Sequence, residues 1–193
     1  MFNVVIFGAP GSGKGTQSEK LIDRFGLHHI STGELLRNHI ASGSELGRIA
    51  DSYISKGHLI PDDLMIDILR HELDNNPEAT GVIFDGFPRT IPQAEALNKM
   101  LAERGTEVHA VVGLEVPEDE LIQRLIKRGE VSGRSDDNPE AIKERLDVYH
   151  NLTSPLRDFY KGENKYHPIT GTGTVDSIFS RIADSLDPIA AKS

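Results

Sequence analysis

Residues 2–16, FNVVIFGAPGSGKGT, decide the fold of this chain. The apolar run Val4–Phe7 is rich in β-branched residues and predicts a buried strand, while the apolar spacing over Thr16–Phe25 predicts a helix. A glycine-rich segment, Gly8–Thr16, joins the two. Glycines let such a loop turn its backbone N–H groups inward, and the helix N-terminus adds further donors. With Lys14 as a mobile positive charge, this strand–loop–helix unit predicts a phosphate-binding site.

The hydroxyl group of this loop is displaced by one position from its usual place. Phosphate-binding loops of this kind carry Ser or Thr directly after the lysine, where the hydroxyl binds Mg²⁺. Here Gly15 follows Lys14, and Thr16 carries the hydroxyl. We expect Thr16 to bond a phosphate oxygen, with Mg²⁺ held by nucleotide oxygens and waters, because this ion gives up its water reluctantly. Direct ligation of Mg²⁺ by Thr16 is the alternative.

Composition limits the classes of protein to which the chain can belong. A length of 193 residues, with 37% hydrophobic and 26% charged residues, predicts one ordinary globular domain. Thirty acidic and 21 basic residues give a net charge of −9, so we expect neither nucleic acid nor a membrane as a partner. Cysteine is absent, and we expect no disulfide and no structural zinc. No segment fits a signal peptide or a membrane span, which predicts a cytoplasmic protein.

Short apolar runs alternate with longer amphipathic ones along the chain. The runs predicted as strands are Val4–Phe7, His28–Ile30, Val82–Phe84, Val108–Leu114 and Tyr166–Thr170. The predicted helices are Thr16–Phe25, Leu64–Leu73, Ile91–Arg104, Glu118–Lys127, Ala141–Tyr160 and Val175–Leu186. This alternation predicts an α/β fold of the P-loop NTPase type, in which helices flank a five-stranded parallel sheet. Ligands of such sheets bind at the carboxyl ends of the strands.

Two stretches interrupt the alternation. Residues 31–60 contain short helical patterns broken by Gly43, Gly47 and Gly57, with no strand between them, and residues 129–139 form a polar insert. Both are expected to project from a core made of residues 1–30, 61–128 and 140–193. Their composition by itself favours plain surface loops.

Three separated motifs resemble the adenylate kinase family. They are Gly8–Gln17, the segment Asp85-Gly86-Phe87-Pro88-Arg89, and the segment Arg134-Ser135-Asp136-Asp137. The resemblance spans most of the chain, and the short distance between Arg128 and Asp137 is similar to the short-lid form of the family. It implies that residues 31–60 are an AMP-binding arm and that residues 129–139 are a lid over ATP. It also implies a monomer that, with Mg²⁺, transfers a phosphoryl group reversibly from ATP to AMP, giving two ADP.

The resemblance also assigns residues to the ATP side of the site. Arg124 resembles the residue that flanks the ATP base, and Arg128 resembles a phosphate-binding arginine. Gly173 resembles a backbone contact to the adenine of ATP. The phosphate loop implies contacts from Gly11, Ser12, Gly13, Lys14, Gly15 and Thr16.

On the AMP side, the resemblance implies contacts to the base, the phosphate and the edge of the adenine ring. Thr32 resembles a contact beside the base, and Arg37 resembles a contact to the phosphate. Gln93 resembles the amide that reads the adenine edge. An amide suits this task because it can donate and accept a hydrogen bond at once. The other implied AMP contacts are His58, Leu59, Ile60, Gly86, Phe87, Pro88, Arg89, Arg134 and Arg145.

Phosphoryl transfer explains the importance of the arginines. Its transition state is loose and carries negative charge on the equatorial oxygens, so the protein mainly positions groups and stabilises charge. Bidentate, permanently charged guanidinium groups suit that task. The predicted catalytic set is Lys14, Arg89, Arg128, Arg134 and Arg145. For any one of these arginines taken alone, the alternative interpretation is that it belongs to an ordinary solvent-exposed basic surface.

Acidic residues supply candidates for two further roles. Asp85 ends the apolar run Val82–Phe84, where a carboxylate at a strand's carboxyl end can hold Mg²⁺, in this case through water. Asp136 and Asp137 either pair with lid arginines or shape the closed lid, and ordinary surface acids are the alternative; we favour a lid role for Asp136. The eight histidines show no metal-binding or catalytic spacing, so no catalytic histidine is predicted.

Other functions fit parts of the sequence. A UMP or CMP kinase of the same fold is the nearest rival, but pyrimidine-directed relatives look to have a smaller residue in place of Thr32 and an asparagine pattern in place of Gln93. A regulatory GTPase needs a guanine-reading Asn-Lys-x-Asp motif, and the segment Asn98-Lys99-Met100-Leu101 lacks the aspartate. A purely structural P-loop scaffold would not require the set of arginines.

Overall fold

The computed structural model describes residues 1–193. The strands are β1 (Phe2–Gly8), β2 (His28–Ser31), β3 (Gly81–Asp85), β4 (Ala110–Glu115) and β5 (Tyr166–Thr170). The helices are α1 (Lys14–Phe25), α2 (Thr32–Ala41), α3 (Glu45–Ile54), α4 (Asp62–Asp74), α5 (Ile91–Ala102), α6 (Glu118–Ser132), α7 (Pro139–Val148), α8 (Leu156–Gly162) and α9 (Val175–Ala190). A short π-helical segment, Tyr149–Thr153, separates α7 from α8.

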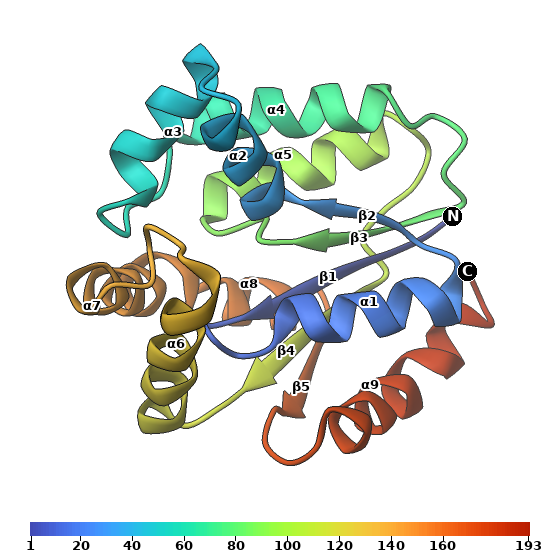
Figure 1. The fold of residues 1–193 in the computed structure, drawn as a ribbon. Coiled ribbons are helices and arrows are strands. Elements are labelled where there is room, and N and C mark those ends of the chain that lie inside the picture. The colour runs from blue at the N-terminus through green and yellow to red at the C-terminus, as the bar shows by residue number, and fades with distance from the viewer.

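All five strands pair in parallel in one sheet, in the order β2-β3-β1-β4-β5. The predicted α/β class and the five predicted strands are therefore confirmed. From the central β1, the chain first crosses to the β2–β3 side and later to the β4–β5 side. Such a reversal leaves a crevice at the carboxyl ends of the central strands. Figure 1 shows α2, α3, α6 and α7 gathered around this end of the sheet, with both termini at the opposite end.

Side-chain alternation along β1 builds one core on each face of the sheet. Val5 and Phe7 belong to the core under α4, α5 and α8, while Val4 and Ile6 belong to the core under α1 and α9. In Figure 1, α1 and α9 lie together on one side of the strands. Because both faces of a parallel sheet are covered, its strands are apolar on both sides, which explains their continuous hydrophobic runs. None of the helices combines the length and the apolar character needed to cross a membrane.

The single helix predicted over Ala141–Tyr160 is wrong. The structure divides this stretch into α7, the π-helical segment and α8. Pro155 explains the break, because proline has no backbone N–H to donate and its ring clashes with the carbonyl four residues earlier. Strand β4 also begins at Ala110 instead of Val108, which is buried just before the strand. The other predicted elements are present with shifted ends; the largest extensions are those of α6, which continues past Lys127 to Ser132, and α9, which continues past Leu186 to Ala190.

The excursion at residues 31–60 folds as two short helices. Ser31 caps α2 and Ser44 caps α3, each with its side-chain oxygen. We expected Gly47 to break the helical pattern. Instead, it lies in the first turn of α3. A Cβ atom at this position would stand 2.0 Å from the carbonyl oxygen of His39. Glycine is therefore required for α2 and α3 to pack this closely.

The non-helical part of the polar insert is shorter than predicted. Helix α6 continues to Ser132 and α7 begins at Pro139, so only residues 133–138 lie between them. Gly133, with φ 63°, ends α6 in the left-handed conformation typical of helix C-termini. Asn138 caps α7 by accepting a hydrogen bond from the N–H of Ala141 at 2.9 Å. Both ends of the insert are thus fixed by defined helix caps.

One amide side chain is buried in the central strand. Asn3 has no exposed surface. Its Nδ2 donates to Thr106 Oγ1 at 3.1 Å and to the carbonyl of Glu107 at 2.9 Å, and its Oδ1 accepts from the N–H of Val82 at 3.2 Å. Asn3 therefore ties β1 to β3 and to the segment that leads into β4.

We expect Asn3→Ala to lower the free energy of unfolding by about 2–4 kcal/mol, because it removes three hydrogen bonds of a buried side chain, each worth roughly 0.5–1.5 kcal/mol. The partners that lose Asn3 are Thr106 Oγ1, the carbonyl of Glu107 and the N–H of Val82. Urea denaturation measures the loss. Asn151→Ala, at an exposed position, is the control and should change stability by no more than about 0.5 kcal/mol. An equal loss in both variants would contradict the role assigned to Asn3.

Candidate functional site

The phosphate loop has the backbone geometry of an anion site. Gly11 and Gly13 have φ values of 82° and 94°, which residues with a side chain rarely adopt. The first intrahelical hydrogen bond of α1 runs from the N–H of Gln17 to the carbonyl of Gly13 at 3.1 Å. The N–H groups of residues 14–16 therefore have no helical carbonyl to bond. These donors, together with the positive end of the helix dipole, favour a phosphate at this point.

Lys14 folds back over the loop. Its Nζ donates to the carbonyls of Gly8 at 3.0 Å and Ala9 at 3.2 Å. Burial lowers the pKa of Lys14 to about 7; Asp85 opposes this shift, and nearby arginines reinforce it. A bound phosphate would supply the negative charge that stabilises the ammonium group.

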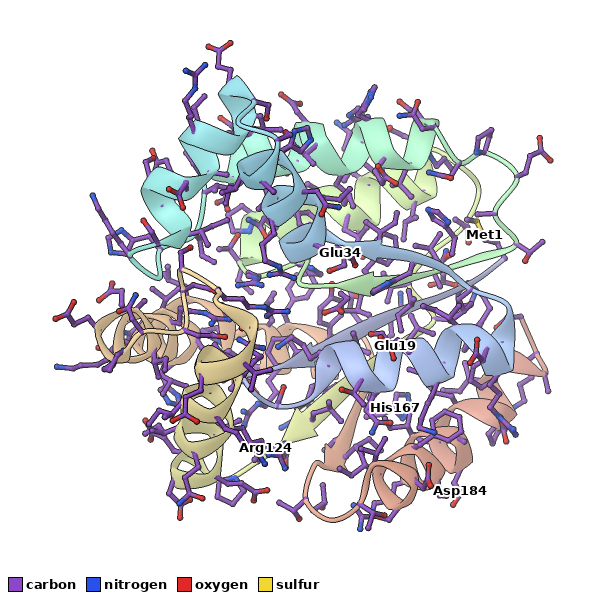
Figure 2. The ribbon with its side chains drawn as sticks, in the orientation of Figure 1. Met1, Glu19, Glu34, Arg124, His167 and Asp184 are labelled. Atoms are coloured by element: carbon purple, nitrogen blue, oxygen red, sulfur yellow. The ribbon has the colours of Figure 1, made fainter.

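A polar cavity of about 1200 Å³, counting the solvent space at its mouth, opens over the loop. None of its lining residues is hydrophobic. Figure 2 shows Glu34 of α2, Glu19 of α1 and Arg124 of α6 around this opening. The predicted site residues that line it are Gly11, Gly13, Lys14, Gly15, Thr16, Arg37, Asp85, Gly86, Arg89, Arg124, Arg128, Arg134 and Arg145. The structure thus brings the whole predicted catalytic set to one cavity.

Two residues predicted on the ATP side do not line this cavity. The side chain of Ser12 is buried beneath the loop, and its Oγ has no hydrogen-bond partner. Gly173 lies in the loop between β5 and α9. Arg124 connects this loop to the phosphate loop, because it donates to the carbonyl of Gly171 at 3.0 Å and to that of Gly11 at 3.4 Å. The β5–α9 loop therefore borders the phosphate loop without forming a wall of the polar cavity.

Asp85 ends β3 and is buried beside the phosphate loop. Its Oδ2 accepts hydrogen bonds from His29 Nε2 at 3.3 Å and from Ser18 Oγ at 3.5 Å. Burial by itself raises the pKa of Asp85, but the hydrogen bond from His29 and the charge of Lys14 hold it below its ordinary value. The carboxylate is therefore charged at neutral pH and faces the polar cavity.

His29 is a site residue that the sequence did not single out. We interpreted the histidine pair as the entry to a strand, and both residues do begin β2. Parallel pairing places His29 beside Ile83, from where its ring reaches Asp85 at the end of the neighbouring strand. Only the strand register reveals this contact, since 56 residues separate the two side chains.

Two lid carboxylates hold two arginines. Asp137 accepts from Nε and Nη2 of Arg128, both at 2.7 Å, and from Nη1 of Arg145 at 3.0 Å. Asp136 lies 3.2 Å from Nη1 of Arg145. Both residues are only 6% exposed, so the prediction of pairing is confirmed and the surface-acid alternative is wrong. Asp137, and not the Asp136 that we favoured, makes the larger number of contacts.

A second cavity lies between the arm and the segment that follows β3. Its volume is about 600 Å³, counting the solvent space at its mouth. Leu36, Ile54 and Met65 give it apolar walls, which suit a nucleoside better than a phosphate. The predicted AMP contacts that line it are Thr32, Arg37, His58, Leu59, Ile60, Gly86, Arg89, Gln93 and Arg145. Phe87 and Pro88 line an adjoining cavity that also contains Lys14, and Arg134 lines the polar cavity instead.

Arg89 occupies the junction of the two main cavities, since it lines both. Its Nε donates to the carbonyl of Gly86 at 2.9 Å, which also accepts from Thr32 Oγ1 at 2.9 Å. Burial and the nearby charge of Arg145 lower the pKa of Arg89 to about 10, against the opposing effect of Asp85. The guanidinium group therefore keeps its positive charge at neutral pH.

Comparisons with known proteins agree with this geometry. The family model described as adenylate kinase matches residues 6–165. A protein of Bacteroides thetaiotaomicron named adenylate kinase is 61% identical over 189 residues, which cover 98% of this chain and 100% of the relative. Relatives with the same name are 60% identical in Phocaeicola vulgatus, with the same coverage, and 48% identical in Azobacteroides pseudotrichonymphae, over 97% of this chain and 98% of the relative. The chain therefore belongs to the adenylate kinase family.

Proposed function

We propose that the chain transfers the terminal phosphoryl group of ATP to AMP, reversibly, giving two ADP. One observation carries this proposal: the polar cavity over the phosphate loop and the partly apolar cavity beside the arm share Arg37, Arg89 and Arg145 in their walls. The triphosphate of a donor in the first cavity and the phosphate of an acceptor nucleotide in the second would meet at these arginines. A protein that only bound or hydrolysed one nucleotide would need no second, nucleoside-sized cavity.

The chain's own residues supply position and charge. The N–H groups of the phosphate loop and Lys14 would hold the donor phosphates, while Arg89 would hold the acceptor phosphate beside them. Arg128 and Arg145 present guanidinium groups towards the polar cavity, where the migrating group carries its negative charge. Because these donors are already fixed by the fold, little reorganisation is needed when the charge develops.

The residues present fit a magnesium ion that is held mainly by its nucleotide. The structure contains no cluster of three or more His, Cys, Asp or Glu side chains that could hold a metal by themselves. Mg²⁺ commonly takes one or two carboxylates, substrate phosphates and several waters. Asp85 would hold it through water, and Thr16 would bond a phosphate oxygen nearby. When bound, the ion neutralises part of the charge on the ATP phosphates.

The lid would exclude water from the transfer. Water that attacked ATP in place of AMP would waste the donor, so both cavities must be closed when both substrates are present. Residues 129–139 carry Arg134 and the two carboxylates that bind Arg128 and Arg145. Movement of this segment would therefore carry charged groups to or from the phosphates.

The acceptor assignment depends on the base-side cavity. Gln93 is buried in its wall and would read the adenine edge, with Thr32 beside the base. Thr32 and Gln93 are also the two residues whose identity argues against a UMP or CMP kinase. We also propose that the protein is a monomer and that it is located in the cytoplasm.

The acceptor assignment predicts a clear order among nucleoside monophosphates. With ATP and Mg²⁺, ADP should form fastest with AMP, far more slowly with UMP or CMP, and hardly at all without an acceptor. A coupled assay of ADP formation measures all four reactions. Faster turnover with UMP than with AMP, or turnover that needs no acceptor, would contradict the proposed function.

Arg89→Ala should lower kcat by at least about a hundredfold, a conservative value given that a phosphate-stabilising arginine can be worth roughly 10³–10⁵ in rate. Arg89→Lys should recover only part of the loss, because an ammonium group cannot make the bidentate contact. Arg70→Ala, which removes an exposed arginine paired with Glu103, is the matched control. Normal turnover in a folded Arg89→Ala variant would exclude the role given to Arg89.

Asp137→Asn should lower kcat by about 10- to 100-fold, since misplacing groups by about 1 Å can cost roughly 10²-fold. The variant keeps the shape of the side chain but weakens the charged bonds that hold Arg128 and Arg145 in place. Steady-state kinetics measure the effect. Asp23→Asn, at an exposed position in α1, should leave kcat unchanged. If the two variants behaved alike, Asp137 would have no part in placing the arginines.

A further inference from the structure

The amide of Gln93 is held at both of its polar atoms. Its Oε1 accepts from the backbone N–H of Arg89 at 2.8 Å, and its Nε2 donates to Asp62 Oδ1 at 2.8 Å. A backbone N–H can only donate and a carboxylate can only accept, so each partner independently requires the same orientation of the amide. Gln93 is 2% exposed and forms part of the wall of the base-side cavity. Its donor and acceptor atoms therefore occupy fixed positions.

Asp62 acts on this amide from outside the cavity. It is the first residue of α4 and is absent from the cavity wall. Its Oδ1 also accepts from Thr90 Oγ1 at 3.0 Å, and Thr90 in turn caps α5 by accepting from the N–H of Gln93 at 3.3 Å. Thus Asp62, Thr90 and Gln93 form one network that joins the start of α4 to the start of α5.

The hydrogen-bonding capacity of the amide leaves one donor and one acceptor for a ligand. An amide has two N–H donors and two lone pairs on its oxygen. Asp62 uses one donor and the N–H of Arg89 uses one lone pair. The Watson–Crick edge of adenine presents an acceptor at N1 and a donor at its 6-amino group, which match the remaining pair. A 6-oxo purine presents the reverse pattern, a donor at N1 and an acceptor at O6, and would need the amide to be flipped.

We propose that Asp62 is a specificity-determining residue that locks Gln93 in the orientation that accepts a 6-amino purine and rejects a 6-oxo purine. This inference depends on the proposed function, in which Gln93 reads the acceptor base. Flipping the amide would place its NH₂ group against the N–H of Arg89 and its oxygen against the carboxylate of Asp62. Both contacts would then be repulsive, and Asp62 contributes the stronger of the two because its acceptor is charged.

Asp62→Asn removes the lock with the smallest possible change in shape. The new amide can either accept or donate, so it can satisfy Gln93 in both orientations. The comparison uses AMP and its 6-oxo analogue IMP as acceptors, with ATP and Mg²⁺ held constant. The ratio of kcat/KM for AMP to that for IMP should fall at least tenfold in Asp62→Asn, through a gain with IMP as well as a loss with AMP. The KM for ATP should not change.

Asp63→Asn is the matched control. It removes the same charge from the first turn of α4, at the next and exposed position, and should keep the selectivity of the unmodified chain. Asp62→Ala, which offers no partner to Gln93, is a second variant and should lose part of the selectivity, while the N–H of Arg89 still favours the original orientation. Thermal unfolding establishes that each variant is folded.

Two results would overturn the inference. One is an unchanged AMP-to-IMP ratio in a folded Asp62→Asn variant, and the other is an equal loss of activity with both acceptors. Failure of the proposed function gives a different result, since the unmodified chain would then show no turnover with AMP. In that case, calorimetric binding of AMP and IMP to the unmodified chain and to Asp62→Asn would still decide whether Asp62 sets the preference between them.

Discussion

The site depends on holding several positive charges together in one cleft of an acidic protein. The chain has a net charge of −9, yet burial and mutual repulsion lower the pKa values of Arg37, Arg89, Arg134 and Arg145. At an effective dielectric constant of 20, two unit charges 4 Å apart interact by about 4 kcal/mol. This repulsion is tolerated because the fold supplies fixed carboxylates and carbonyls as partners. An anion with several phosphates would relieve it further, so the charges that line the site favour such a ligand.

These charges meet only when the whole fold is formed, because they come from separate elements. Arg37 lies on α2, Arg89 follows β3, Arg128 lies near the end of α6, and Arg145 lies on α7. The parallel sheet directs all of these elements to the carboxyl ends of its strands, where the phosphate loop follows β1. Helices and strand ends hold side chains more precisely than free loops do, which suits a reaction that depends on position.

The sequence predicted those features that depend on local pattern. The spacing of hydrophobic residues and the phosphate loop were sufficient to predict the five strands. The family resemblance identified the arginines of the predicted catalytic set. The break at Pro155 was visible in the sequence, but the apolar pattern continues across it and concealed it. The contacts of Asp85 with His29 and of Gln93 with Asp62 could not be predicted, because strand register and the packing of α4 against α5 bring together residues that are far apart in the chain.

These contacts share one physical logic. An acidic chain that binds polyanions must keep its carboxylates from repelling the substrates. Asp62, Asp85 and Asp137 each accept hydrogen bonds from two different side chains, and each thereby fixes a donor that lines one of the cavities. Their carboxylate oxygens are engaged by donors within the protein, while the groups they orient, an amide, an imidazole and two guanidinium groups, line the cavities. The acidic residues around the site therefore act mainly by positioning its donors.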